Sequence, residues 1–299
     1  MDLKGIFPPL TVPFASDGTV DHGKLRSNIE RYNATRLAGY VLNGSTGESV
    51  LLRWTEIYEI WETAKKTAAR GKILIAGTGA ESTAETIEHT NRAAAQGYDF
   101  ALVRTPSYYK PLLSLEVEAE HYLRVADAAK IPVLLYSVPA FTGYAIEASL
   151  LALVANHRNI AGIKDSSGIV ERVSEFVAVT PKGFRVLVGS AATLAPSLEK
   201  GGAGGILAMA CAFPDLCCEI YEATLAGDRA RAEQLQQNLS APSAIISSKY
   251  GIPGLKYALD QIGYAGGLPR PPLLPIGAEA KREIDGVLAG VATLARTGD

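Results

Sequence analysis

Short apolar runs alternate with longer stretches of helical periodicity along most of the chain. The runs are rich in Val, Ile and Leu and lie at residues 5–14, 40–42, 72–77, 100–103, 132–136, 159–164, 184–189 and 204–209. They recur about every 25 to 30 residues, with a helical stretch between each run and the next. Near-continuous apolar runs are typical of parallel strands covered on both faces, and eight strand–helix units close into a barrel. We therefore predict an α/β fold, a (β/α)8 TIM barrel.

The last part of the sequence has a different pattern. From residue 214 onward there is no strand-like run, and helical stretches lie at 216–225, 228–248, 255–261 and 278–294. We predict that residues 1–213 form the barrel that carries the active site. Residues 214–299 are predicted to form a C-terminal helical extension packed on the barrel, and not an independent domain.

Composition excludes several classes of function. The formal net charge is -2 and no basic tract stands out, so nucleic acid is not expected as a partner. No apolar run approaches the roughly 20 residues of a membrane span, and the first residues lack the pattern of a signal peptide. The three cysteines, Cys211, Cys217 and Cys218, and the four histidines show no metal-ligand spacing. We expect a cytoplasmic protein without a membrane partner and without a metal site.

One lysine stands at the end of the sixth apolar run. Lys164 is followed by Asp165, two serines and Gly168, which predicts a strand that ends in a turn. In a (β/α)8 barrel the active site lies at this end of the strands. Burial of an ammonium group favours the neutral amine, which is the form that attacks a carbonyl. Lys164 is thus a candidate Schiff-base nucleophile, although a structural lysine paired with a neighbouring carboxylate fits the same pattern.

A tyrosine ends the fifth run, beside the lysine in the predicted sheet. Because side chains alternate along a strand, Tyr136 and Lys164 can both point into the barrel. An imine formed on a lysine lets an adjacent carbon–carbon bond break or form through an enamine. Each step moves a proton, which requires an acid–base group such as Tyr136, with Thr46 and Tyr108 as candidate relays. The alternative for Tyr136 is a packed side chain whose hydroxyl is satisfied by backbone.

The second run ends in a turn of small polar residues. Hydroxyl groups and backbone N–H groups of Gly44, Ser45 and Thr46 suit a carboxylate ligand. An ordinary glycine turn that caps the next helix is the alternative.

Four segments together resemble one known family, the dihydrodipicolinate synthase / N-acetylneuraminate lyase family of class I pyruvate-dependent aldolases. These segments are Gly44–Glu48, Thr105–Tyr109, Tyr136–Pro139 and Gly162–Asp165. The resemblance covers nearly the whole chain. It implies that Lys164 forms the imine with pyruvate and that Tyr136 carries protons. It also implies that Thr46 links Tyr136 to a Tyr108 supplied by a neighbouring subunit.

The resemblance implies further site residues and an assembly. Ser45 and Thr46 hold the pyruvate carboxylate, and the backbone near Ile206 closes the pyruvate pocket. Ser166 is associated with a substrate hydroxyl, and Gly189, which ends the seventh run, is a further substrate-binding candidate. The implied partners are pyruvate and an aldehyde or 2-oxo acid. The resemblance implies no cofactor other than the covalent imine on Lys164. It also implies a homotetramer built as a dimer of dimers.

Other positions bear on which member of the family the chain resembles. Phe141 stands where a dihydrodipicolinate synthase usually has an arginine, and Gly189 is not followed by the acidic residues of a sialic acid lyase. Residues 136–143, 251–256 and 263–267 resemble the 4-hydroxy-2-oxoglutarate aldolase branch, whose animal members have asparagine in place of Thr46. We predict an aldolase that cleaves or forms a 4-hydroxy-2-oxo acid such as 4-hydroxy-2-oxoglutarate.

Three alternatives stay open at this point. The first is a 4-hydroxy-tetrahydrodipicolinate (dihydrodipicolinate) synthase. The second is a 2-keto-3-deoxy sugar acid aldolase or dehydratase, since bacterial members share the Ser-Thr-Gly-Glu sequence at 45–48. The third belongs to another class, a non-catalytic sensor that binds a keto acid on the same barrel.

Overall fold

Eight parallel strands close into a barrel in the computed structural model, which describes residues 3–297. The strands are β1 (Gly5–Phe7), β2 (Gly39–Leu42), β3 (Ile73–Gly77), β4 (Phe100–Arg104), β5 (Val133–Ser137), β6 (Ile160–Asp165), β7 (Arg185–Val188) and β8 (Gly204–Ile206). Consecutive strands pair from β2 to β8, and β8 pairs with β1. Bonds between Leu10 N–H and the Val41 carbonyl (2.9 Å) and between Val41 N–H and the Pro8 carbonyl (3.0 Å) join the first segment to β2. The predicted (β/α)8 fold is confirmed.

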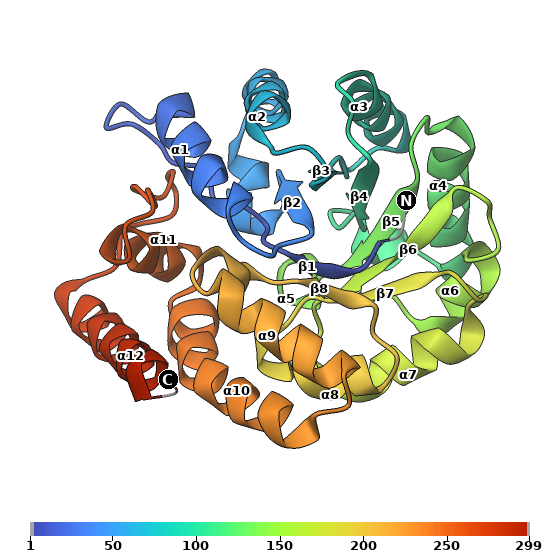
Figure 1. Cartoon of the computed structure of the whole chain (residues 1–299). Coiled ribbons are helices and arrows are strands. Elements are labelled where there is room, and N and C mark those ends of the chain that lie inside the picture. Colours follow the sequence, from blue (N-terminus) through green and yellow to red (C-terminus); the bar gives the residue numbers. More distant parts are fainter. Residues whose placement is uncertain (1–2, 298–299) are drawn as a thin grey trace.

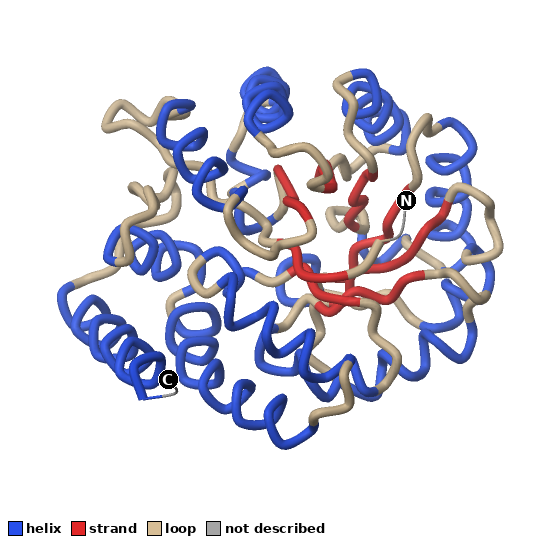
Figure 2. The backbone as a smooth tube through the Cα atoms, viewed as in Figure 1, coloured by secondary structure: helices blue, strands red, loops and turns tan. Residues whose placement is uncertain are grey.

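Helices surround the strands on the outside of the barrel (Figures 1 and 2). The helices that follow β1 to β7 are α1 (His22–Asn33), α2 (Trp54–Thr67), α3 (Thr83–Ala95), α4 (Leu115–Ala128), α5 (Pro139–Thr142), α6 (Ala148–Val154), α7 (Val170–Val179) and α8 (Leu194–Glu199). Most of these helices, such as α1, α2, α4, α6 and α7, bury apolar residues against the strands, which explains why the strand sequences are apolar at nearly every position. Among residues 3–297, none of these helices, nor those that follow, has the length and hydropathy of a membrane-spanning segment.

Two strands, β1 and β8, end several residues earlier than the sequence predicts. The first run was predicted to be a strand over 5–14, but β1 ends at Phe7, where Pro8 and Pro9 follow. Proline has no N–H to donate to a neighbouring strand, so regular pairing stops there. The last run was predicted over 204–209, and β8 ends at Ile206 before a helical turn, Ala208–Cys211.

The C-terminal helices lie together on one side of the ring (Figure 1). They are α9 (Pro214–Leu225), α10 (Arg229–Pro242), α11 (Gly251–Gln261) and α12 (Ala278–Thr297). Helix α9 follows β8 and packs against α8 and β1, so it completes the outer ring, while α10 packs on α9. The chain therefore continues from barrel to extension without a gap, and the division at residue 213 stays a prediction.

A π-helix, Ser243–Lys249, separates α10 from α11. It follows Pro242, whose ring lacks the N–H that a regular helix would use and crowds the preceding turn. The π-helix contacts the helical turns Ala191–Thr193 and Ala208–Cys211, which follow β7 and β8. It therefore lies over the carboxyl ends of the strands.

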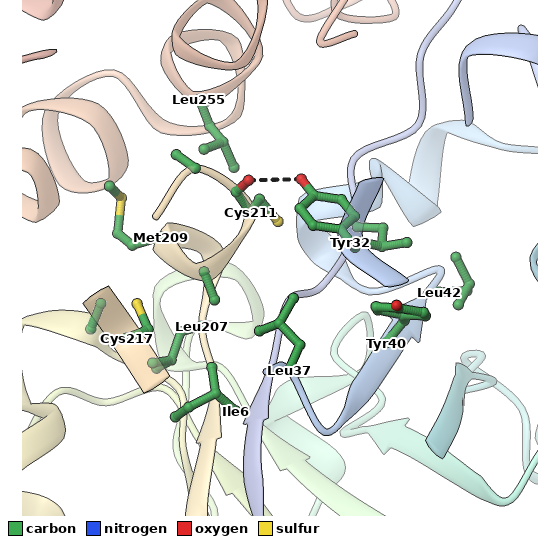
Figure 3. Packing of buried hydrophobic residues seen from close by; sticks show 14 of the residues in the cluster. Ile6, Tyr32, Leu37, Tyr40, Leu42, Leu207, Met209, Cys211, Cys217 and Leu255 are labelled. Atoms are coloured by element: carbon green, nitrogen blue, oxygen red, sulfur yellow. Dashed lines mark hydrogen bonds between the residues drawn. The ribbon is translucent and has the colours of Figure 1, made fainter. Parts of the chain in front are cut away.

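Buried aliphatic, aromatic and sulfur-containing side chains fill the layer between the strands and the helices that cover them, which include α1 and the C-terminal helices (Figure 3). The Tyr32 hydroxyl donates a hydrogen bond to the Cys211 carbonyl over 2.7 Å, and its ring stacks on Tyr264 with centroids 4.6 Å apart. Cys211, Cys217 and Cys218 are free thiols, and all three are buried. The hydrogen bond from Tyr32 to Cys211 holds the turn Ala208–Cys211, which follows β8, against α1.

Candidate active site

Lys164 and Tyr136 lie side by side at the carboxyl ends of β6 and β5. They are direct partners in the register of the two strands. Their exposed fractions are only 4% and 5%, and the Lys164 ammonium nitrogen lies 4.2 Å from the centroid of the Tyr136 ring. The alternation of side chains along the strands thus brings the amine and the phenol together as predicted.

The neighbouring carboxylate does not pair with the lysine. Asp165 accepts a hydrogen bond from the Ser167 hydroxyl. Among the described residues no carboxylate forms an ion pair with Lys164. In the described part of the chain, Lys164 is therefore not a structural lysine held by an adjacent carboxylate.

The turn after β2 approaches the same two side chains. The Ser45 hydroxyl lies 3.3 Å from the Tyr136 hydroxyl, within hydrogen-bond distance. Asn43 has a left-handed backbone (φ 61°), and its side-chain amide donates to the Gly77 carbonyl over 2.7 Å. The hydroxyl next to Tyr136 is thus that of Ser45, and the link through Thr46 stays a prediction.

One cavity of about 460 Å³ brings most of the predicted site residues together. Its lining includes Ser45, Thr46, Tyr136, Lys164, Ser166, Gly189 and Ile206. Within the described part of the chain, Lys164 is the only charged side chain in that lining. The cavity therefore has one nucleophilic amine among hydroxyl groups and apolar surface.

Tyr108 is not brought to this cavity within the chain. Its side chain is 78% exposed and makes an edge-on contact with the Tyr109 ring, with centroids 5.1 Å apart. Its backbone N–H donates to the Glu81 carboxylate over 3.0 Å. The position is open to a second copy of the chain, so its expected role across a subunit boundary stays a proposal.

Gly189 is required by the close approach of two turns. A Cβ atom at this position would lie 2.0 Å from the Ser166 hydroxyl oxygen and 2.8 Å from the Asp165 carbonyl oxygen. The Gly189 N–H donates to that carbonyl over 2.7 Å. A side chain here would displace Ser166 from the cavity wall.

The buried Cys211 thiol is near Lys164 but does not compete with it as a nucleophile. Its thiol donates to the Pro9 carbonyl over 3.2 Å. Burial raises the pKa of the Cys211 thiol to about 12, although Lys164 acts in the opposite direction. The group therefore stays protonated and is a poor nucleophile.

One side of the cavity is formed by the C-terminal segment and was not predicted from the sequence. This side consists of Ser243, Ser247, Ser248, Gly251, Ile252 and Leu255. The only signal for it was the spacing of the three serines, which recur within one or two turns of a helix. The segment was predicted as part of one long helix without a functional face.

A buried ion pair holds the turn after β2 in place. Glu48 and Lys256 both have 0% exposed side chains, and the ammonium nitrogen lies 2.5 Å from a carboxylate oxygen. Lys256 also donates to the Leu268 carbonyl over 2.8 Å, and the second Glu48 oxygen accepts from the Arg270 N–H over 2.7 Å. Burial lowers the pKa of Lys256, while the charge of Glu48 opposes that change. The pair thus joins the turn carrying Ser45 to α11.

Arg270 extends this network to α2. Its guanidinium donates to both oxygens of Glu56, over 2.9 and 2.7 Å, and hydrogen bonding lowers the pKa of that carboxyl. The Phe14 ring packs against both cations, with centroid distances of 4.3 Å to Lys256 and 4.4 Å to Arg270. The segment after α11 is thereby fixed against the barrel.

No metal site accompanies these groups in the described residues. No set of three or more His, Cys, Asp or Glu side chains between residues 3 and 297 could hold a metal ion.

Comparisons with known proteins agree with this geometry. The sequence profile of the dihydrodipicolinate synthetase family matches residues 2–290. A 4-hydroxy-tetrahydrodipicolinate synthase of Exiguobacterium sibiricum is 37% identical over 273 residues, which cover 91% of this chain and 92% of the relative. The synthase structure of Methylacidiphilum fumariolicum is 29% identical, with a TM-score of 0.93 and coverage of 99% and 98% of the two chains.

A third similar protein was solved with a ligand. The dihydrodipicolinate synthase of Acinetobacter baumannii, in complex with pyruvate, is 28% identical with a TM-score of 0.92, and the match covers 97% of this chain and 99% of that one. The names of these relatives do not support the closeness to the 4-hydroxy-2-oxoglutarate aldolase branch predicted from residues 136–143, 251–256 and 263–267. They favour the synthase alternative.

We expect Lys256→Met to destabilise the fold strongly. The substitution leaves the Glu48 carboxylate buried without its partner, which costs about 3–5 kcal/mol in comparable cases. Urea unfolding with linear extrapolation measures the change in the free energy of unfolding. The control is Lys249→Met, which removes an exposed lysine paired with Glu283 and should change stability little. Equal effects of the two substitutions would contradict a stabilising role of the buried pair.

Proposed function

Since the chain belongs to the dihydrodipicolinate synthetase family, we propose that Lys164 forms an imine with pyruvate and that the resulting enamine reacts with an aldehyde. Enzymes of this family are carbon–carbon lyases that use such an imine in place of a separate cofactor. The observation that carries the proposal for these residues is the buried contact between the Lys164 amine and the Tyr136 ring inside one cavity.

The neutral amine of Lys164 attacks the ketone carbon of pyruvate, and water leaves as the protonated imine forms. Tyr136 protonates the departing hydroxyl, and the resulting phenolate then takes a methyl proton, which gives the enamine and restores the Tyr136 hydroxyl. Its carbon attacks the aldehyde carbonyl, and the new alkoxide takes a proton from the Tyr136 hydroxyl. Water finally hydrolyses the imine, which releases the product and restores the amine. In the cleavage direction, Tyr136 takes the proton of the C4 hydroxyl and the C3–C4 bond breaks.

The groups around this pair fit the same reaction. Ser45 and Thr46 line the cavity on the turn after β2, where hydroxyl and N–H groups can bind the pyruvate carboxylate. Ser45 is also close enough to Tyr136 to accept or return its proton. A sensor that only binds a keto acid needs no such proton path, so the arrangement favours the enzyme over the sensor.

The first reaction to test is that of a 4-hydroxy-tetrahydrodipicolinate synthase, with aspartate 4-semialdehyde as the aldehyde. The names of the relatives support it. A second candidate is aldol cleavage of a 4-hydroxy-2-oxo acid, a class that includes 2-keto-3-deoxy sugar acids. It is favoured by Phe141, which lines the cavity and is 69% exposed where a synthase usually has an arginine.

We also propose the assembly and location that the resemblance implies. In a homotetramer the exposed Tyr108 of one subunit would reach the cavity of its neighbour. Tyr109 and Leu112 beside it are also exposed, at 68% and 71%, and would be covered by the same contact. Three free thiols fit a reducing cytoplasm.

Borohydride reduction in the presence of pyruvate tests the imine. We expect the intact mass to increase by one reduced pyruvate adduct and peptide mapping to place the adduct on Lys164. Lys164→Ala should give no adduct and no turnover. Lys256, the other fully buried lysine in this region, is ion-paired and should remain unmodified. A folded native chain without an adduct, at saturating pyruvate, would remove the mechanism.

Tyr136→Phe tests the proton path. The substitution keeps the ring beside Lys164 and removes the hydroxyl, so imine formation should slow and kcat should fall by about 10²- to 10⁴-fold. Steady-state kinetics measures the change. Tyr98→Phe is the matched control, because its hydroxyl donates to the Trp61 carbonyl away from the cavity. Near-normal turnover of Tyr136→Phe would refute the acid–base role.

Phe141→Arg tests the choice between the two candidate reactions. A guanidinium at the cavity entrance would bind the carboxylate of aspartate 4-semialdehyde, so kcat/KM for that aldehyde should rise about tenfold or more. Phe141→Ala, which removes the ring without adding charge, separates the effect of the charge from that of space. If the native chain already has a high kcat/KM for aspartate 4-semialdehyde, and Phe141→Arg does not raise it, the result would favour the synthase reaction.

A further inference from the structure

Three serines on the π-helix Ser243–Lys249 face the cavity that contains Lys164. Ser243, Ser247 and Ser248 all line it, and they range from 3% exposed at Ser243 to exposed at Ser248. A π-helix closes its hydrogen bonds from i to i+5, so residues four and five apart lie on one face. The wide turn after Pro242 thus places three hydroxyl groups on one wall of the cavity.

The deepest of these hydroxyl groups has no partner in the protein. Among the described residues the Ser243 oxygen is buried and makes no hydrogen bond. An unpaired buried hydroxyl costs free energy and is rare in native structures. Because Ser243 is a lining residue of the cavity, rotation about its Cα–Cβ bond can turn the hydroxyl toward a bound molecule, which then supplies the missing partner.

The location of the serines fits the second substrate and not pyruvate. The hydroxyl groups suited to the pyruvate carboxylate come from Ser45 and Thr46 on the turn after β2. The π-helix instead packs on the turns after β7 and β8. The cavity of about 460 Å³ exceeds what a three-carbon acid needs, so a second molecule has room beside the imine.

The groups in the cavity lining that can bind a second substrate are hydroxyl groups and not charged side chains. Apart from Lys164, which the imine uses, no charged side chain lines the cavity in residues 3–297. Serine hydroxyls donate to and accept from oxygen atoms, so they suit a hydroxyl or a carboxylate on the aldehyde. An aldehyde with a purely apolar tail would leave the Ser243 oxygen unpaired.

We propose that Ser243, Ser247 and Ser248 form the subsite for the aldehyde and that they bind the oxygen-bearing end of its chain. The inference rests on the proposed function, because it assigns the second substrate of the same cavity. It makes these serines specificity-determining residues that select aldehydes with a distal hydroxyl or carboxylate.

Matched aldehydes test the subsite on the native chain. Glyceraldehyde and propanal share three carbons and differ in hydroxyl groups, while succinic semialdehyde and butanal share four and differ in a carboxylate. We expect kcat/KM to be about tenfold or more higher for the oxygen-bearing member of at least one pair. The pair with the larger ratio identifies whether the bound group is a hydroxyl or a carboxylate.

Single substitutions locate the preference. Ser247→Ala and Ser243→Ala should each lower kcat/KM for the preferred oxygen-bearing aldehyde about five- to tenfold. They should leave its apolar counterpart and the KM of pyruvate unchanged. Ser240→Ala is the control, because this serine lies one turn earlier, is exposed, and its hydroxyl donates to the Gln236 carbonyl. It should change none of these values.

Thermal unfolding separates this role from a structural one. Since the Ser243 hydroxyl has no partner to lose, Ser243→Ala should leave the Tm unchanged or raise it. Selectivity that is unchanged in both cavity variants, or a Tm of Ser243→Ala that falls, would overturn the subsite.

Borohydride trapping with pyruvate on every variant keeps the two proposals distinguishable. An adduct on all variants with unchanged aldehyde selectivity removes the subsite alone. No adduct on the native chain removes the proposed function and the subsite together.

Discussion

The arrangement of the site depends on the buried pair of Glu48 and Lys256. Two charges removed from water are stable only when their mutual attraction and additional hydrogen bonds replace hydration. Here the Leu268 carbonyl and the Arg270 N–H supply those bonds. The pair holds Glu48 in a left-handed conformation (φ 58°), and this conformation ends the turn that carries Ser45 and Thr46. The hydroxyl next to Tyr136 is therefore positioned by a helix that is remote in the sequence.

The cavity is assembled from three parts of the chain with different chemistry. Strand ends supply Lys164 and Tyr136, which are fixed by the register of β5 and β6. The turn after β2 supplies hydroxyl groups suited to a carboxylate. The C-terminal helices close the remaining side with the π-helix and α11. The extension thus belongs to the site as much as the barrel does.

Much of this arrangement follows from sequence patterns, and the reasons are physical. Lys164 and Tyr136 could be paired from the sequence because parallel strands align their ends and side chains alternate with a period of two. The contact of Ser45 with Tyr136 was not predicted, because it depends on a backbone turn with positive φ at Asn43 and Glu48, which hydrophobic periodicity does not encode.

The rest could not be read from one sequence. The pairing of Glu48 with Lys256 joins residues 208 positions apart, and nothing local in either segment specifies the other. The serine wall depends on a π-helix, and helical periodicity does not distinguish a π-helix from an α-helix. A π-helical turn holds one residue more than an α-helical turn, so the loss of one residue between 243 and 249 would restore regular winding. Such a deletion would tighten the turn that carries the three serines and would leave the facing of the helix beyond it largely unchanged, because the wider turn holds the removed residue in excess. Insertions and deletions in this segment, and not only substitutions, are therefore a route by which relatives of this chain could change the aldehyde they accept.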